Sequence, residues 1–154
     1  MARLIFALVS LVCMFQTLAA PLQSRAVTSK ECSSFNVQAS IGIDAARTSL
    51  GSINTGNDIG NARNLLEAQL SLLDANNGTT QIADSLLVNA PPAPADANAR
   101  IVSGLQASLA SLSHVVLIVD NSTKAAVAAA NASMTTALES AQQAVAANCQ
   151  TTVN

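Results

Sequence analysis

Cysteine and histidine carry the most specific chemistry in this chain, and both are scarce. The 154 residues include three Cys and a single His, His114. Cys13 falls within an apolar N-terminal run, which leaves Cys32 and Cys149 near the two ends of the remaining chain. A structural metal site takes four ligands, and a nucleophilic cysteine needs a positioned base. Since neither is visible, we expect Cys32 and Cys149 to form a structural disulfide.

The N-terminal segment has the pattern of a secretory signal peptide. Arg3 precedes an apolar run from Leu4 to Phe15, and small residues follow up to Ala20. The run is too short to span a bilayer. We therefore expect a signal peptide over residues 1–19 with cleavage near Ala19 or Ala20. The product would be secreted and extracellular, compatible with association with the cell wall, and without a transmembrane anchor.

Export gives the two remaining cysteines an oxidising environment, which favours the disulfide. Because the bridge would close almost the whole mature chain into a loop, the chain-entropy model assigns it about 4–5 kcal/mol. Cys32 precedes the first expected helix and Cys149 ends the last. The bridge therefore requires those two helices to be neighbours, which an even number of helices achieves most simply.

Other catalytic and binding chemistry finds little support. His114 is expected on an exposed helix face, and no phosphate loop, metal-ligand cluster or nucleophile elbow is present. The seven basic residues are outnumbered by nine acidic ones and form no basic run. The chain also has no Trp or Tyr. Both observations argue against nucleic-acid binding. We expect a non-enzymatic protein with no catalytic residues, no cofactor and no metal site.

Alanine and leucine dominate the apolar residues and favour helices, whereas strands prefer β-branched and aromatic residues. We predict an all-α fold, an antiparallel bundle of four to five helices with one disulfide linking its N- and C-terminal ends. A single helical-bundle domain over residues 34–154 would follow a flexible lead-in over residues 20–33. The Pro-rich segment 89–95 would form an extended connector within that domain.

Apolar residues at helical spacing locate the expected helices. The first begins near Ser34 and carries Phe35, Ala39, Ile43, Ala46, Leu50 and Ile53. The second carries Ile59, Ala62, Leu66, Leu70 and Leu73 and ends at the turn dipeptide Asn77-Gly78. A short helix follows over residues 80–88. The fourth, capped by Asp96, carries Ile101, Val102, Leu105, Leu109, Leu112, Val116 and Val119, and the fifth carries Val127, Ala130, Met134, Leu138, Ala141 and Val145.

The expected stripes supply a core, and other apolar residues lie off them. We expect a core of Leu66, Leu70, Leu105, Leu109, Leu112, Met134 and Leu138. A second apolar face is formed by Val37, Ile41, Leu65, Leu72, Leu117 and Ile118. One stripe per helix suffices for a simple bundle. The second face therefore packs on a fifth helix, lines a lipid-sized cavity or faces an apolar surface. In the last two cases Leu65, Leu72 and Leu117 would contact the ligand.

Three N-glycosylation sequons follow the expected leader, at Asn77, Asn121 and Asn131. Asn77 and Asn121 fall in expected turns, where the acceptor is accessible. Asn131 lies at the edge of an apolar stripe, which disfavours its use. Chance occurrence in a chain rich in Asn, Ser and Thr is the alternative explanation.

The leader, the helical body rich in Ala, Leu, Ser and Thr, and the segment Asn64-Leu-Leu-Glu-Ala-Gln-Leu-Ser-Leu-Leu73 resemble a group of fungal small secreted proteins. This group is the hydrophobic surface-binding protein A and cell-wall galactomannoprotein family. The resemblance spans most of the mature chain and rests on pattern and composition. It implies an extracellular helical domain that associates with apolar surfaces or binds fatty-acid-like ligands.

The expected function is therefore a secreted, non-enzymatic protein that binds lipid-like apolar ligands or hydrophobic surfaces at the cell exterior. The alternative is a secreted effector or cell-wall interaction protein that acts through its exterior surface. Its partner would then be a cell-wall or host component.

Overall fold

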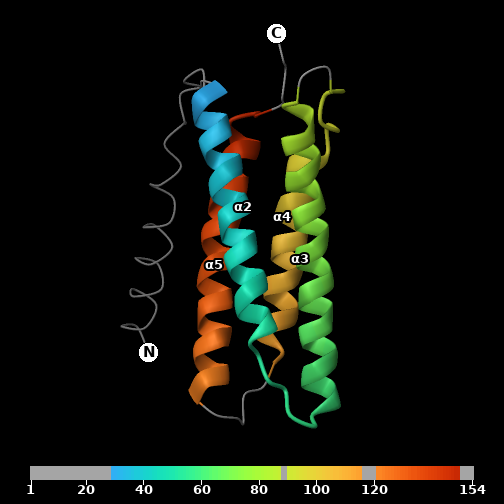
Figure 1. Ribbon diagram of the computed structural model, residues 1–154, viewed down its shortest axis with the longest axis vertical. Helices are drawn as coiled ribbons and strands as arrows, with labels where there is room; N and C mark the ends of the chain where they lie inside the picture. Colours follow the sequence, from blue (N-terminus) through green and yellow to red (C-terminus); the bar gives the residue numbers. More distant parts are fainter. Residues whose placement is uncertain (1–28, 88–89, 116–120, 150–154) are drawn as a thin grey trace, which may run out of the picture.

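The protein is an antiparallel bundle of α-helices (Figure 1). The computed structural model describes residues 29–87, 90–115 and 121–149, and these form four helices and no strand. The helices are α2 (Ser29–Gly51), α3 (Ile59–Ser85), α4 (Ala97–Ser113) and α5 (Asn121–Ala146). The all-α prediction is confirmed, with four helices in this part of the chain. The expected signal peptide over residues 1–19 lies outside the described residues.

Helix α2 begins earlier than expected, at Ser29, so the end of the expected lead-in over residues 20–33 is helical. Helix α4 starts after Asp96, as expected, but the Asp96 side chain makes no capping hydrogen bond. It ends at Ser113, and the later apolar residues expected to extend it, Leu117 among them, lie outside the described residues. Helix α5 begins at Asn121, so this residue, expected in a turn, is the first of a helix.

Helix α3 runs unbroken through the dipeptide that was expected to end it. Asp58 caps its start by accepting a hydrogen bond from the Asn61 backbone N–H at 2.9 Å. The prediction of a turn at Asn77-Gly78 and of a separate helix over residues 80–88 is wrong. Gly78 lies against α4, where an added Cβ would be 2.7 Å from Ile101 Cγ1 and 2.8 Å from the Ala97 carbonyl oxygen. Close packing on α4 therefore explains this glycine and outweighs its low helix propensity.

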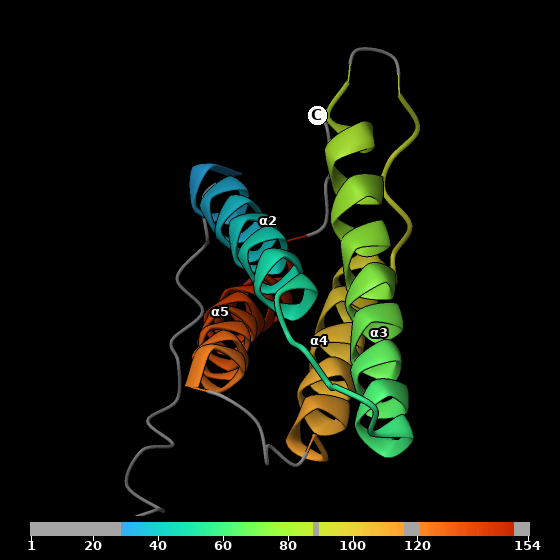
Figure 2. The same ribbon diagram turned by 60° about the horizontal axis from the view of Figure 1, so that its bottom comes forward.

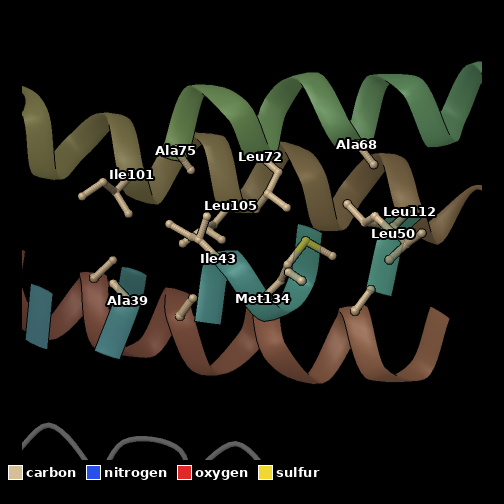
Figure 3. Packing of buried hydrophobic residues seen from close by; sticks show 14 of the residues in the cluster. Ala39, Ile43, Leu50, Ala68, Leu72, Ala75, Ile101, Leu105, Leu112 and Met134 are labelled. Carbon is tan, nitrogen blue, oxygen red and sulfur yellow. The ribbon is translucent and has the colours of Figure 1, made fainter. Parts of the chain in front are cut away.

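The four helices form two closely packed pairs, α2 with α5 and α3 with α4 (Figure 2). Backbones approach closely within each pair because small residues line the contact. A Cβ on Gly42 of α2 would lie 2.8 Å from Ala137 Cβ of α5. Likewise, a Cβ on Gly104 of α4 would lie 2.7 Å from the Ser71 carbonyl oxygen of α3. The two pairs meet through larger side chains, among them Ile43, Leu72, Leu105 and Met134 (Figure 3).

The expected core is confirmed on α4 and α5, and the apolar stripe expected on the first helix is buried with it on α2. Ile43, Leu50, Leu105, Leu112 and Met134 are fully buried. Two further residues of the expected core, Leu109 and Leu138, are partly buried and pack against this cluster.

The expected core is wrong on α3. Leu66 and Leu70 are exposed, whereas Leu65 and Leu72, assigned to the second face, are buried. The buried side of α3 is built mostly from small or polar residues, namely Asn61, Ala68, Ala75, Gly78, Thr79 and Ser85 beside Leu65, Leu72 and Ile82. Because small residues permit close approach to α4, the side of α3 with fewer large apolar residues is the one that packs inward.

The disulfide closes one end of the bundle. Cys32 and Cys149 are bonded, with their Cα atoms 5.4 Å apart and a sequence separation of 117. An even number of helices brings the start of α2 and the end of α5 to the same end of the bundle (Figure 1). The Asn98 side-chain amide of α4 donates to the Cys149 carbonyl oxygen at 2.9 Å. The predicted disulfide is confirmed, and this hydrogen bond ties the second helix pair to it.

Candidate hydrophobic surface on helix α3

A row of large apolar side chains lies on the outer side of α3. Its members are Ile59, Leu66, Leu70 and Leu73, which are 85, 54, 56 and 46% exposed. Spacings of seven, four and three residues place all four on one side of a helix. We refer to these four residues as the α3 apolar row.

The α3 apolar row lies opposite the side of the helix that enters the core. Leu65 and Leu72, each one residue before a member of the row, are buried with the core cluster. Consecutive residues in a helix are about 100° apart, so these adjacent leucines point in well-separated directions. The two leucine faces of this helix are therefore used differently, one for folding and one left exposed.

Charged side chains border the α3 apolar row along the edge nearest α4. Arg63 Nε lies 3.0 Å from Glu67 Oε1, and Arg100 of α4 lies 3.6 Å from Asp74. All four side chains are at least partly exposed, so each pair contributes about 0–1 kcal/mol to stability. Their main effect on the surface is to give the apolar row a polar border.

Two of the residues expected to contact an apolar ligand lie elsewhere, and the third is not among the described residues. Leu65 and Leu72 belong to the packed core, and Leu117 lies outside the described residues. Sequence reasoning missed Leu66, Leu70 and Leu73 as surface residues because they form the stronger apolar stripe. The usable signal was the series Asn61, Ala68, Ala75 and Gly78, small or polar residues at helical spacing that mark a close helix contact.

A second pair of exposed apolar side chains lies on α2. Val37 and Ile41 are 54 and 63% exposed, one helical turn apart, as expected for residues off the main stripe of this helix. This pair matches Leu66 and Leu70 in spacing and exposure, but α2 offers no third or fourth large residue to extend it. The α3 apolar row is therefore the longer of these two aligned sets of exposed apolar side chains.

The three sequons lie in different surroundings. Asn77 is exposed within α3 rather than in a turn, and Asn121 is exposed as the first residue of α5. Asn131 is half-buried within α5.

His114 follows α4 and is exposed, as expected. Its backbone carbonyl oxygen accepts a hydrogen bond from the Asn64 side-chain amide at 3.0 Å. The contact is made by the backbone, so it gives the imidazole no chemical role. Across the described ranges, no three His, Cys, Asp or Glu side chains are grouped as a metal site.

None of the described helices has the length and hydropathy needed to cross a bilayer. Comparisons with protein-family models, with curated proteins and with solved structures give no match for this chain.

Proposed function

We propose that this is a secreted, non-enzymatic protein that binds hydrophobic surfaces or fatty-acid-like ligands at the cell exterior. The observation that carries the proposal is the α3 apolar row, four large side chains aligned on the side of α3 opposite the core. Exposed apolar residues are common singly on protein surfaces, but aligned ones mark a contact face.

The energy available from the row is sufficient for adsorption. Fully burying a Leu or Ile side chain is worth about 1.5–3 kcal/mol. The members of the row are about half exposed or more, so covering each one would contribute about 1 kcal/mol or more. Four such contributions give reversible binding to an apolar phase without any change in the fold.

Two further features support the proposal. Charged residues make up only 10% of the chain, so few charges compete with apolar contact at the surface. The leader pattern and the family resemblance both indicate an extracellular protein, and the resemblance implies contact with apolar surfaces. The disulfide is compatible with that compartment.

Adsorption to alkyl-coated beads, measured with paired variants, tests the proposal. Leu66→Ser with Leu70→Ser removes the middle of the α3 apolar row. Val37→Ser with Ile41→Ser is the matched control, because these residues have the same spacing and similar exposure on α2. We expect the first variant to lose about tenfold or more in bead affinity, since each 1.4 kcal/mol is a factor of ten, and the control to retain it.

An equal loss of bead affinity in both double variants would contradict the assignment of binding to the α3 apolar row. Absence of adsorption by the unmodified protein would contradict surface binding. Native mass spectrometry of protein mixed with a C16 fatty acid tests the ligand alternative separately. Failure of both assays would favour the alternative, a secreted effector or cell-wall interaction protein with a specific partner.

A further inference from the structure

Asn77 lies on the same side of α3 as the apolar row. It follows Leu70 by seven residues and Leu73 by four, which are the spacings that align side chains along a helix. It is also exposed. Asn77 therefore continues the α3 apolar row by one more turn, and it is the asparagine of the sequon Asn77-Gly78-Thr79.

The neighbours of Asn77 fix its outward direction. Gly78 packs against α4, where Ile101 and the Ala97 carbonyl oxygen leave no room for a Cβ. Thr79 is buried, and its hydroxyl donates to the Asn76 carbonyl oxygen at 2.8 Å. Because the next two residues face the bundle, Asn77 faces solvent, where a large group attached to its side chain meets no helix.

Of the other two sequon asparagines, one is also exposed and the other is not. Asn121 is exposed at the start of α5, a helix that makes no close contact with α3. Asn131 is half-buried, and its sequon partner Ser133 has its carbonyl oxygen 2.9 Å from the position of a Cβ added to Gly42, where α2 and α5 pack closely. A glycan is therefore compatible with the fold at Asn77 and Asn121, and of these two only Asn77 is on the row.

We infer that Asn77 is N-glycosylated and that its glycan limits contact between the α3 apolar row and apolar surfaces. The second half of this inference rests on the proposed function. The Asn77 Nδ2 atom bonds to the anomeric carbon of an oligosaccharide, and that carbon's bond to the pyrophosphate of its lipid carrier breaks. The amide loses one proton, and the carrier leaves as its diphosphate. Since folding buries Thr79, the transfer precedes the packing of α3 on α4.

The position of the glycan determines which part of the row it affects. Leu73 and Leu70 lie one and two turns from Asn77, whereas Ile59 lies at the far end of α3. A hydrated glycan at Asn77 therefore screens the half of the row nearest to it and leaves the far half accessible. Glycosylation is expected to weaken adsorption without abolishing it.

The test uses full-length protein secreted from a eukaryotic host. Unmodified protein, Asn77→Gln and the matched control Asn121→Gln are compared by intact mass and by adsorption to alkyl-coated beads. We expect Asn77→Gln to lose the mass of one glycan and to adsorb several-fold more strongly. Asn121→Gln is expected to leave the Asn77 glycan and the adsorption unchanged.

For Asn77→Gln, a mass that differs from that of the unmodified protein only by the methylene group that Gln adds would overturn the modification site. A lost glycan with unchanged adsorption would overturn the screening role, provided that the variant adsorbs. If Asn77→Gln carries no glycan and still fails to adsorb, the proposed function itself is contradicted. Thermal melting of each variant controls for loss of folding. We expect the melting temperature of Asn77→Gln to be unaffected by core packing, because Gln at this exposed position makes no new contact with the core.

Discussion

Leu72 and Leu73 are adjacent in the chain and point about 100° apart around α3, the first fully buried between the helix pairs and the second 46% exposed in the apolar row. Leu72→Ala is expected to destabilise the protein by about 2–5 kcal/mol, because it leaves a cavity in the core. Leu73→Ala is expected to change stability by about 0.5 kcal/mol or less while lowering bead adsorption. Denaturant unfolding beside the adsorption assay checks both, and a reversed order of stabilities would contradict the assignment of the two faces.

Gly78 provides a test of the close contact between α3 and α4. Gly78→Ala is expected to destabilise by about 1–3 kcal/mol, since the new Cβ must displace Ile101 and the α4 backbone. Gly51→Ala is the control, because a Cβ there meets nothing within 4 Å and alanine is the better helix former. Thermal melts should move in opposite directions for the two variants. A stabilised Gly78→Ala would mean that the helices are farther apart.

The two polar atoms of the Asn98 side-chain amide are in different situations. Its nitrogen donates to the Cys149 carbonyl oxygen, while its oxygen is buried without a hydrogen-bond partner. Asn98→Ala removes both the bond and the unpaired oxygen, so we expect a net change of about 1 kcal/mol or less. Asn98→Asp replaces the donor by an acceptor facing Cys149, which is expected to cost about 2 kcal/mol or more at neutral pH. Equal unfolding free energies for the two variants would contradict the donor role.

The disulfide is expected to contribute a large share of the stability. The double variant Cys32→Ser with Cys149→Ser should lose about 2–5 kcal/mol, since the bridge closes a long loop. Urea unfolding of this variant and of the oxidised protein measures the difference. Alkylation before reduction is the control, because native protein should contain no free thiol at either position. Two reactive thiols in the native protein would contradict the presence of the disulfide itself.

Sequence periodicity located the core well on α2. Ala39, Ile43 and Leu50 form one apolar stripe, and both its small and its large members enter the core. The pairing of Cys32 with Cys149 was also predictable, because composition pointed to helices and the leader pointed to an oxidising compartment. In these places, local pattern and tertiary packing favour the same residues.

Periodicity failed on α3 for a physical reason. A hydrophobic stripe reports how apolar a helix face is, whereas the tight α3–α4 contact depends on how closely the backbones approach. Gly78 and Ala75 are weakly apolar but small, and they are buried against the bundle, whereas Leu66 and Leu70 are exposed. The surface we propose as functional is thus the one that periodicity alone assigns to the core. Recognising it from sequence required weighing residue size as well as hydropathy.

The disulfide also determines how the bundle would carry a mechanical load. Tension applied to the chain before Cys32 and after Cys149 passes directly through the sulfur–sulfur bond, because that bond joins the two residues covalently. The long loop between them, which holds nearly all of the four helices, is bypassed. A protein anchored by one end of its chain and pulled by the other would keep its folded helices unstretched. The α3 apolar row would then stay assembled under a force that unravels bundles without such a bond.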